Sequence, residues 1–366
     1  MNFFIRILII ALSGVPFLTY ADSKSDSLGI MPGQSCNDCC GSVQTPVGVM
    51  TDHIHPKGAW VVSYTYMNMM MKGNKAGTAN LSDNQVYQNY MMSPQTMSMQ
   101  MHMLMAMYSF TDRLTVMAMG GFVANNMSMN MDQAGMNMMM NMPGMNMGTD
   151  YGSSMISKSS GLADTRIYGL YRIVSNCGNN LVGSLGVSLP TGTTSASGMT
   201  LLGNNEQLSY AMQIGTGSFG LLPSLTYVRK SGFWSLGAEA GALINMNTNA
   251  QGYRWGNTYN ATAWAGYRFI SSLSASIRAE GIYMGNIAGF DKDIAVLMNN
   301  DPNANINNYG GQRVNIYAGL NYSIKKLNGL IVMAEYGIPV YQNLNGPQMS
   351  MHGNAIAGIQ YMFNKK

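Results

Sequence analysis

Hydrophobic and polar residues alternate along most of the chain, with the period of two that half-buried β-strands show. In residues 273–283, LSASIRAEGIY, the odd positions are apolar or small, whereas the even positions mostly carry Ser, Arg and Glu. Residues 329–338 and 353–363 repeat the pattern. Because successive side chains of a strand point to opposite faces, each segment is predicted to have one apolar and one polar face.

Twelve segments of this kind follow one another, and the connections between them alternate in length. The segments lie at 58–71, 96–109, 113–126, 160–173, 180–189, 210–230, 233–246, 258–269, 273–285, 311–323, 329–340 and 353–363. Short connections lie near 111–112, 174–179, 230–232, 271–272 and 325–328. Long polar connections lie at 72–95, 127–159, 190–209, 247–257, 286–310 and 341–352. The chain is therefore predicted to have short turns at one end of its sheet and long loops at the other.

This arrangement is typical of outer-membrane barrels, in which short periplasmic turns alternate with long extracellular loops. Segments of about 10 residues match the length of a tilted strand that crosses the bilayer. In lipid every strand edge must be paired, so the sheet must close on itself. A soluble β-sandwich is the alternative, but it does not explain the short and long ends. We predict an all-β fold, a single closed antiparallel transmembrane β-barrel of about 12 strands.

The first residues have the features of a secretory signal peptide. Arg6 precedes an apolar run at 7–18, and small residues precede a cleavage point after Ala21. The predicted parts are a signal peptide at 1–21, a periplasmic N-terminal extension at 22–57 and the barrel at 58–366. The predicted location is the cell outer membrane of a Gram-negative bacterium.

The composition excludes several classes of protein. Charged residues make up 10% of the chain, against about 25% in an ordinary soluble domain. The net charge is +4, and the 20 Lys and Arg residues are scattered, which does not predict a nucleic-acid-binding protein. The sequence contains no G-x-S-x-G or H-E-x-x-H motif, so we do not expect an enzyme.

Several stretches resemble a family of outer-membrane barrels that is named for the MetA pathway of phenol degradation and regarded as transporters. They lie at 46–67, 95–119, 159–173, 186–192, 213–227 and 335–348. Two of them, GVSLPTG at 186–192 and IGTGSFGLLPSLTY at 214–227, are also similar to channels for fatty acids and other hydrophobic substrates. The resemblance implies transport across the outer membrane without naming a substrate.

Methionine is concentrated in one part of the chain, where 25 of the 37 methionines lie between positions 67 and 155. Alternation places Met67, Met69, Met117 and Met119 opposite an apolar face that we assign to lipid, so these four are expected in the lumen. The segment 97–107 between them has Met at every odd position. Whether these six side chains face the lumen or lipid stays open.

The predicted loop at 127–159 contains further methionines in a Met-x-Met repeat. Thioether sulfurs are soft ligands that select Cu(I), and Ag(I) is expected to behave similarly. The candidate ligands, besides the four lumen methionines, are Met127, Met129, Met131, Met136, Met138, Met140, Met142, Met145 and Met147. A low-complexity loop that binds no metal is the alternative. No cofactor is required on either interpretation.

Four cysteines form a second candidate site. Cys36, Cys39 and Cys40 lie near the mature N-terminus, and Cys177 lies in a predicted periplasmic turn on the same side of the membrane. An oxidising compartment favours disulfides, although a Cys-x-x-Cys pair also binds soft metals. Both interpretations stay open.

Six charged residues share the polar face of their segments and are predicted to lie in the lumen. They are Arg166, Glu239, Arg278, Glu280, Arg313 and Glu335. Charges are tolerated inside such barrels. They form either a structural network of ion pairs or a constriction that selects permeants.

Three functions follow from the sequence. The first is an outer-membrane transporter or channel for small solutes, with hydrophobic aromatic compounds favoured by the family resemblance. The second is a Met-rich protein that binds or passes copper or silver. The third is a surface-binding barrel that transports nothing. The expected partners are the lipid bilayer and, for the first function, a small-molecule solute.

Overall fold

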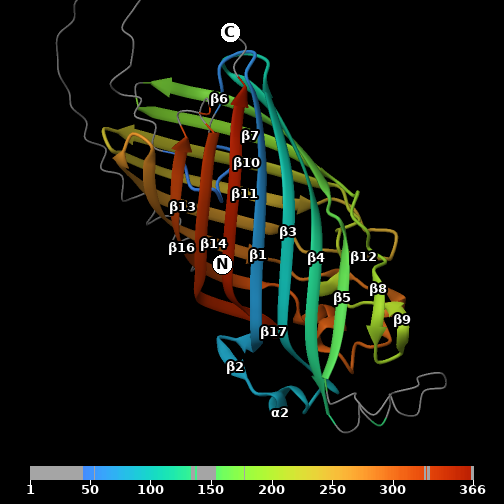
Figure 1. Ribbon diagram of the computed structural model, residues 1–366. Helices are drawn as coiled ribbons and strands as arrows, with labels where there is room; N and C mark the ends of the chain where they lie inside the picture. The colour runs from blue at the N-terminus through green and yellow to red at the C-terminus, as the bar shows by residue number, and fades with distance from the viewer. Residues whose placement is uncertain are drawn as a thin grey trace, which may run out of the picture.

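The computed structural model describes residues 44–52, 54–132, 154–176, 178–324 and 330–363, together with Asn137 and Leu327. This part of the chain is almost entirely β-structure (Figure 1). The long strands are β1 (Trp60–Gly77), β3 (Met92–Ser109), β4 (Leu114–Met131), β5 (Ser154–Leu162), β6 (Thr165–Asn176), β7 (Asn179–Leu189), β10 (Gly220–Ser231), β11 (Trp234–Asn245), β13 (Thr258–Ile270), β14 (Leu273–Met284), β16 (Gly311–Ile324) and β17 (Leu330–Phe363).

These strands form one closed antiparallel sheet. Its order is β17-β16-β14-β13-β11-β10-β7-β6-β4-β3-β1, and β1 pairs again with β17. β17 crosses the wall twice, because residues 330–344 pair with β16 and residues 348–363 pair with β1. The wall is therefore crossed twelve times, an even number, as in bacterial outer-membrane barrels. The predicted fold class is confirmed.

The two faces of the sheet differ as the alternation predicts. Large apolar side chains are exposed over the outside of the barrel, among them Val62, Leu104, Leu236, Ile277 and Leu320. The inner face carries buried hydroxyl and amide groups, among them Ser63, Thr65, Thr226, Ser276 and Asn315. An apolar outside and a polar inside are the arrangement of a transmembrane barrel.

Aromatic side chains form a belt at the end of the barrel that has the short turns. Ring centroids lie 4.7 Å apart for Trp60 and Tyr108, and 4.8 Å apart for Trp234 and Tyr267. The exposed Phe363 ring, near the C-terminus, completes this side of the belt. Such girdles lie at the membrane–water interface, so the short-turn end reaches one interface.

A cap of short elements covers the opposite, long-loop end (Figure 1). They are β2 (Ala79–Leu81), α2 (Asp83–Val86), β8 (Ser197–Thr200), β9 (Gly203–Gln207), η1 (Tyr210–Met212), β12 (Tyr253–Arg254), β15 (Ala288–Gly289), α4 (Lys292–Ala295), η2 (Pro302–Ala304) and η3 (Ile306–Asn308). Tyr210 packs edge to face against Tyr253 and Tyr309, with ring centroids 4.9 and 5.9 Å apart. No helix in the described ranges is long and apolar enough to cross a membrane.

Several predicted boundaries differ from the structure. The loop expected at 127–159 is shorter, because β4 continues to Met131 and β5 begins at Ser154. Residues 341–352, expected as a loop, belong to β17 and turn within it. The strand expected at 210–230 begins only at Gly220.

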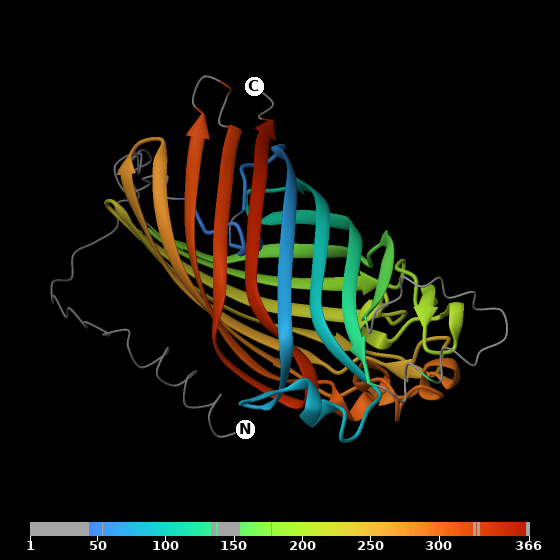
Figure 2. The ribbon, with the colours of Figure 1, turned by 60° about the horizontal axis from the view of Figure 1, so that its bottom comes forward.

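The N-terminal segment also differs from the prediction. Residues up to 57 were expected in a periplasmic extension, yet residues 44–52 and 54–55 lie inside the barrel against strands on several sides of it (Figure 2). We call these residues, 44–52 and 54–55, the plug. Val47 packs on Tyr317 and Ile356, and Val49 packs on Val228 and Trp264.

Three aromatic side chains of the inner face lie over glycines of neighbouring strands. Tyr168 covers Gly186, Tyr317 covers Gly337, and Trp264 covers Gly237. A Cβ added to any of these glycines would overlap the ring. The glycines therefore give the large inner side chains room to lie flat along the wall, which keeps part of the lumen open.

This packing predicts that Gly237→Ala destabilises the barrel, because the Trp264 ring must move. Overpacking of this kind costs about 1–3 kcal/mol, to be measured by urea unfolding in lipid vesicles. Gly120→Ala in β4 is the control, because its added Cβ would meet only Thr165 Oγ1, at 4.0 Å. Equal stabilities of the two variants would contradict the prediction.

Candidate functional site: a plugged lumen lined with methionine

The plug is held by polar contacts with widely separated strands. Thr51 Oγ1 donates to Glu239 Oε2 at 2.5 Å, and the Gly48 N–H donates to Glu335 Oε2 at 3.1 Å. Arg172 Nη2 donates to the Ile54 carbonyl at 2.6 Å. Within the plug, Thr45 also donates to Asp52. The plug therefore bridges β6, β11 and β17 across the inside of the barrel.

Arg278 lies at the centre of the inner charge network. Its guanidinium donates to both oxygens of Glu335, at 2.9 and 3.1 Å, and to Glu280 at 3.2 Å. It also lies 3.9 Å from the centroid of the Tyr317 ring. A Cβ on Gly48 would overlap the guanidinium, so the plug can approach this ion pair only through glycine.

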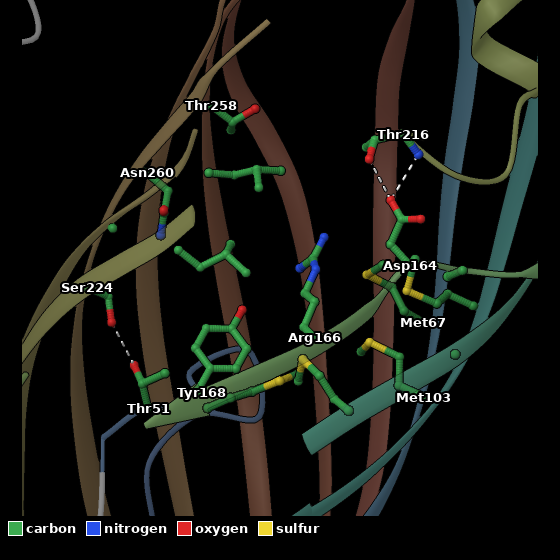
Figure 3. Close-up of a pocket in the computed structure, with 18 of the residues that line it drawn as sticks. Thr51, Met67, Met103, Asp164, Arg166, Tyr168, Thr216, Ser224, Thr258 and Asn260 are labelled. Carbon is green, nitrogen blue, oxygen red and sulfur yellow. Dashed lines mark hydrogen bonds between the residues drawn. The ribbon is translucent and has the colours of Figure 1, made fainter. Parts of the chain in front are cut away.

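A cavity of about 610 Å³ remains between the plug and the wall. Figure 3 shows Arg166 and Tyr168 of β6 extending into it, with Met67 and Met103 on the opposite side. Thr51 of the plug and Glu239 of β11 are among the other polar residues of the lining. The volume lies in the range of sites that bind one small organic molecule.

Methionines of β1, β3 and β4 form one inner wall of this cavity. The register pairs Met67 with Met101 and Met105 with Met119 directly across neighbouring strands. Seven methionines line the cavity, namely Met50, Met67, Met99, Met101, Met103, Met117 and Met119. The odd positions of 97–107 therefore face the lumen, while Leu104, of the even positions, is 63% exposed on the outside.

The wall changes character where β5 ends and β6 begins. β5 pairs with β4 alone among the described strands. The side chains of Ser157 and Ser159 donate hydrogen bonds to backbone carbonyls of the long connection after β7, which contains β8 and η1. Asp164 fixes this loop, accepting from the Gly192 N–H at 2.9 Å and from the Thr216 hydroxyl at 2.7 Å. One carboxylate thus joins the loop to the barrel beside the cavity.

Asp301 is a buried acid in the cap. Its side chain accepts the Asn303 N–H at 2.8 Å and lines a small pocket with methionines of β4 and β5. Burial raises the pKa of the Asp301 carboxyl to about 6, from an ordinary value of 3.8. The cap therefore holds a group that changes charge within the physiological pH range.

The structure brings together most of the charged residues predicted in the lumen. Arg278, Glu280 and Glu335 form one network, Glu239 binds the plug, and Arg166 lines the cavity. Arg313 lies beside Ile282 on the same inner face. Ion pairing accounts for the first three, and permeant selection by any of the six stays a prediction.

The predicted metal ligands are divided between several places. Met67, Met117 and Met119 line the cavity, Met69 pairs with Met99 on the same face, and Met127, Met129 and Met131 lie in β4. The remaining loop methionines lie outside the described residues, as do all four cysteines; they are Met136, Met138, Met140, Met142, Met145, Met147, Cys36, Cys39, Cys40 and Cys177. Within the described ranges, His, Cys, Asp and Glu form no group of three or more that could hold a metal.

Sequence reasoning predicted Glu239 and Glu335 in the lumen but missed the other residues that hold the plug and the cap. Arg172 has the parity of Arg166 on the inner face of β6, which was a usable signal. Thr51, Asn321 and Asp301 carry no such signal, because their roles depend on contacts with distant parts of the chain. Asn321, for example, donates to the Thr45 carbonyl at 3.2 Å, 276 positions away.

Glu335→Gln is expected to destabilise the protein by about 3 kcal/mol, because it leaves the buried Arg278 with only part of its compensating charge. Urea unfolding in vesicles measures the loss. The double variant Arg278→Met with Glu335→Leu removes both charges, so it should lose less stability than the single variant Glu335→Gln does. A single variant as stable as the wild type would contradict this role of the pair.

The Asp301 pKa predicts that the cap is more stable in acid. Because the raised pKa belongs to the closed cap, protonation stabilises it fully below pH 4, and this stability is lost as the pH rises through about 6. Hydrogen-exchange protection of residues 291–309, corrected for intrinsic rates, should fall between pH 5 and 7. Asp301→Asn, which stays neutral, should keep its protection; an equal decline in both proteins would refute the assignment.

Comparisons with known proteins support the fold. A scan of protein-family models finds no match, and a search of curated proteins also finds none. The COG4313 outer membrane channel from Pseudomonas putida F1 is 15% identical, with a TM-score of 0.55, covering 85% of this chain and 97% of that one.

Two further solved structures are more distant. A Pseudomonas aeruginosa FadL homologue is 11% identical, with a TM-score of 0.37, covering 84% of this chain and 89% of its own. The Pseudomonas putida toluene transporter TodX is 10% identical, with a TM-score of 0.36, covering 85% and 90%. Of these three structures, the COG4313 channel has a TM-score above 0.5, and at 15% identity it supports the fold alone: this chain has the fold of an outer-membrane β-barrel.

Proposed function

We propose that the protein is an outer-membrane channel for small solutes, with apolar aromatic compounds as its favoured cargo. The observation that carries the proposal is the cavity of about 610 Å³ inside the closed barrel. A barrel of twelve crossings lies between the small barrels filled by side chains and the porins with sixteen or more strands and wide aqueous channels. Its lumen has room for one small molecule at a time.

The cavity lining favours apolar cargo. Flexible, polarizable thioethers adapt to irregular apolar ligands and make favourable contacts with aromatic rings. Met99, Met101 and Met103 supply such a surface from one strand, and Arg166 and Asp164 supply a few polar groups opposite it. This is the mixture of apolar surface and a few polar groups that small-molecule sites use.

The plug supplies a means of controlling passage. It bridges the lumen through a few hydrogen bonds, such as those of Thr51 and Gly48. Groups of this kind contribute about 0.5–1.5 kcal/mol each, or somewhat more when one partner is charged. The plug can therefore shift without loss of the barrel wall, whose hydrogen bonds are independent of it. On this proposal the protein acts in transport and not as an enzyme.

Gly48→Val is expected to raise the conductance of the protein in planar bilayers several-fold, because its side chain would overlap the Arg278 guanidinium and push the plug away from the Arg278–Glu335 pair. Pro56→Ala, a change at an exposed residue shortly after the plug that does not line the cavity, is the control and should conduct like the wild type. The quenching of tryptophan fluorescence by 1-naphthol measures binding of an aromatic compound in the same samples.

The same measurements can contradict the proposal. If neither the wild type nor Gly48→Val passes ions, swells liposomes or binds 1-naphthol, the protein is not a channel of this kind. A surface-binding barrel that transports nothing would then be favoured.

A further inference from the structure

A second, much smaller cavity lies beneath the cap. Its volume is about 10 Å³, which is about the minimum needed to hold one water molecule. Five methionines line it, namely Met92, Met127, Met129, Met155 and Met199. The cavity therefore has room for a single ion and not for an organic molecule. We call it the methionine pocket.

The strand register brings three of these thioethers together. Met127 and Met129 lie two residues apart on the inner face of β4, and Met155 lies directly across from Met129 in β5. Side chains two residues apart are separated by about 7 Å along a strand, and cross-strand partners by about 5 Å. Three rotatable bonds allow each Met to bring its sulfur toward a shared centre.

Asn303 of the cap contacts the sulfurs of two of these methionines. Its side-chain nitrogen Nδ2 lies 3.7 Å from the sulfur of Met127 and 3.8 Å from the sulfur of Met129. Both sulfurs therefore accept contacts from one donor on the cap side. A cation placed between them would meet the same two lone-pair donors.

The pocket also contains a negative group. Asp301 lines it and is 4% exposed. Among the described residues, the ion pairs of Arg278 do not include Asp301, and the Asp301 carboxylate accepts its hydrogen bond from the uncharged Asn303 N–H. A buried carboxylate without a counter-charge is costly. A bound cation would supply that charge.

The distribution of side chains argues against simple core packing. Leu201, Leu208 and Leu297 line the cap side of the same pocket together with Met199 of β8, so branched apolar side chains fit there. The barrel side, from β3, β4 and β5, is instead lined by Met92, Met127, Met129 and Met155. Apolar packing alone would be equally satisfied by Leu or Ile on that side.

We propose that Met127, Met129 and Met155 bind one Cu(I) or Ag(I) ion in the methionine pocket, with Asp301 as the carboxylate that balances its charge. Neutral thioethers favour soft monovalent cations, whereas Mg²⁺ and Ca²⁺ require oxygen ligands. The binding site is separate from the larger cavity, and its occupancy does not rest on the channel function.

The test uses the full-length protein in detergent, with Met136, Met138, Met139, Met140, Met142, Met145 and Met147 replaced by Leu so that the neighbouring segment contributes no thioethers. Cu(I) is titrated without oxygen against the competing chelator bicinchoninate. The further changes Met127→Leu, Met129→Leu and Met155→Leu together should weaken binding at least 100-fold. Asp301→Asn should weaken it about tenfold, which corresponds to about 1.4 kcal/mol.

Met70→Leu with Met246→Leu is the matched control. Met70 adjoins Met71 in β1 and lies against Gly353 and Tyr336 on the outer face, and Met246 is 63% exposed. The control should bind Cu(I) as tightly as its parent. Excess Mg²⁺ should not compete.

X-ray absorption of the Ag(I)-loaded protein provides an independent readout. Three sulfur neighbours are expected in the parent and two in the single variant Met129→Leu, which decides the question even if the triple variant fails to fold. The proposal is overturned if the parent with the replaced segment binds no Cu(I) or Ag(I). It is equally overturned if the folded triple variant retains the affinity of the parent.

Discussion

The closure of the sheet between β1 and β17 is the constraint on which the rest of this structure depends. In hydrocarbon each unpaired backbone N–H or C=O costs several kcal/mol, so a sheet with a free edge cannot span the bilayer. The register from Trp60↔Phe363 to Lys75↔Gln348 removes both edges along almost the full height of the wall. Closure requires each strand to present one face to lipid and one to the lumen, which explains why so few charged residues suffice.

Closure also creates an interior that must be organised. Arg278 is the clearest case, because a guanidinium that is 2% exposed is stable there only with Glu335, Glu280 and the Tyr317 ring around it. The plug uses that network as its anchor, through the Gly48 N–H. The remaining space is the cavity, so its shape depends on where the plug is held.

The strands were predictable because their two faces meet different surroundings, and alternation records that difference residue by residue. The orientation of the methionines at 97–107 was not predictable from the sequence. A thioether is apolar enough to face lipid and flexible enough to line a lumen. Neighbouring strands decide it: Met101 pairs with Met67, whose strand presents Val62 and Tyr64 to the outside. The plug could not be predicted from local sequence patterns, because its contacts join distant residues such as Gly48 and Glu335, which are 287 positions apart.

Methionine has two different surroundings in this structure, although the sequence shows one continuous repeat. At Met99, Met101 and Met103 of β3 the thioethers face the open cavity, where flexibility lets the wall adapt to changing apolar contents. At Met127 and Met129 the same alternation continues into a closed pocket beside a buried carboxylate. A flexible side chain has little advantage in a pocket with almost no free volume. A soft sulfur lone pair next to a negative charge can instead bind a cation there. The surroundings of each sulfur, and not the abundance of methionine, therefore indicate where metal chemistry is to be sought.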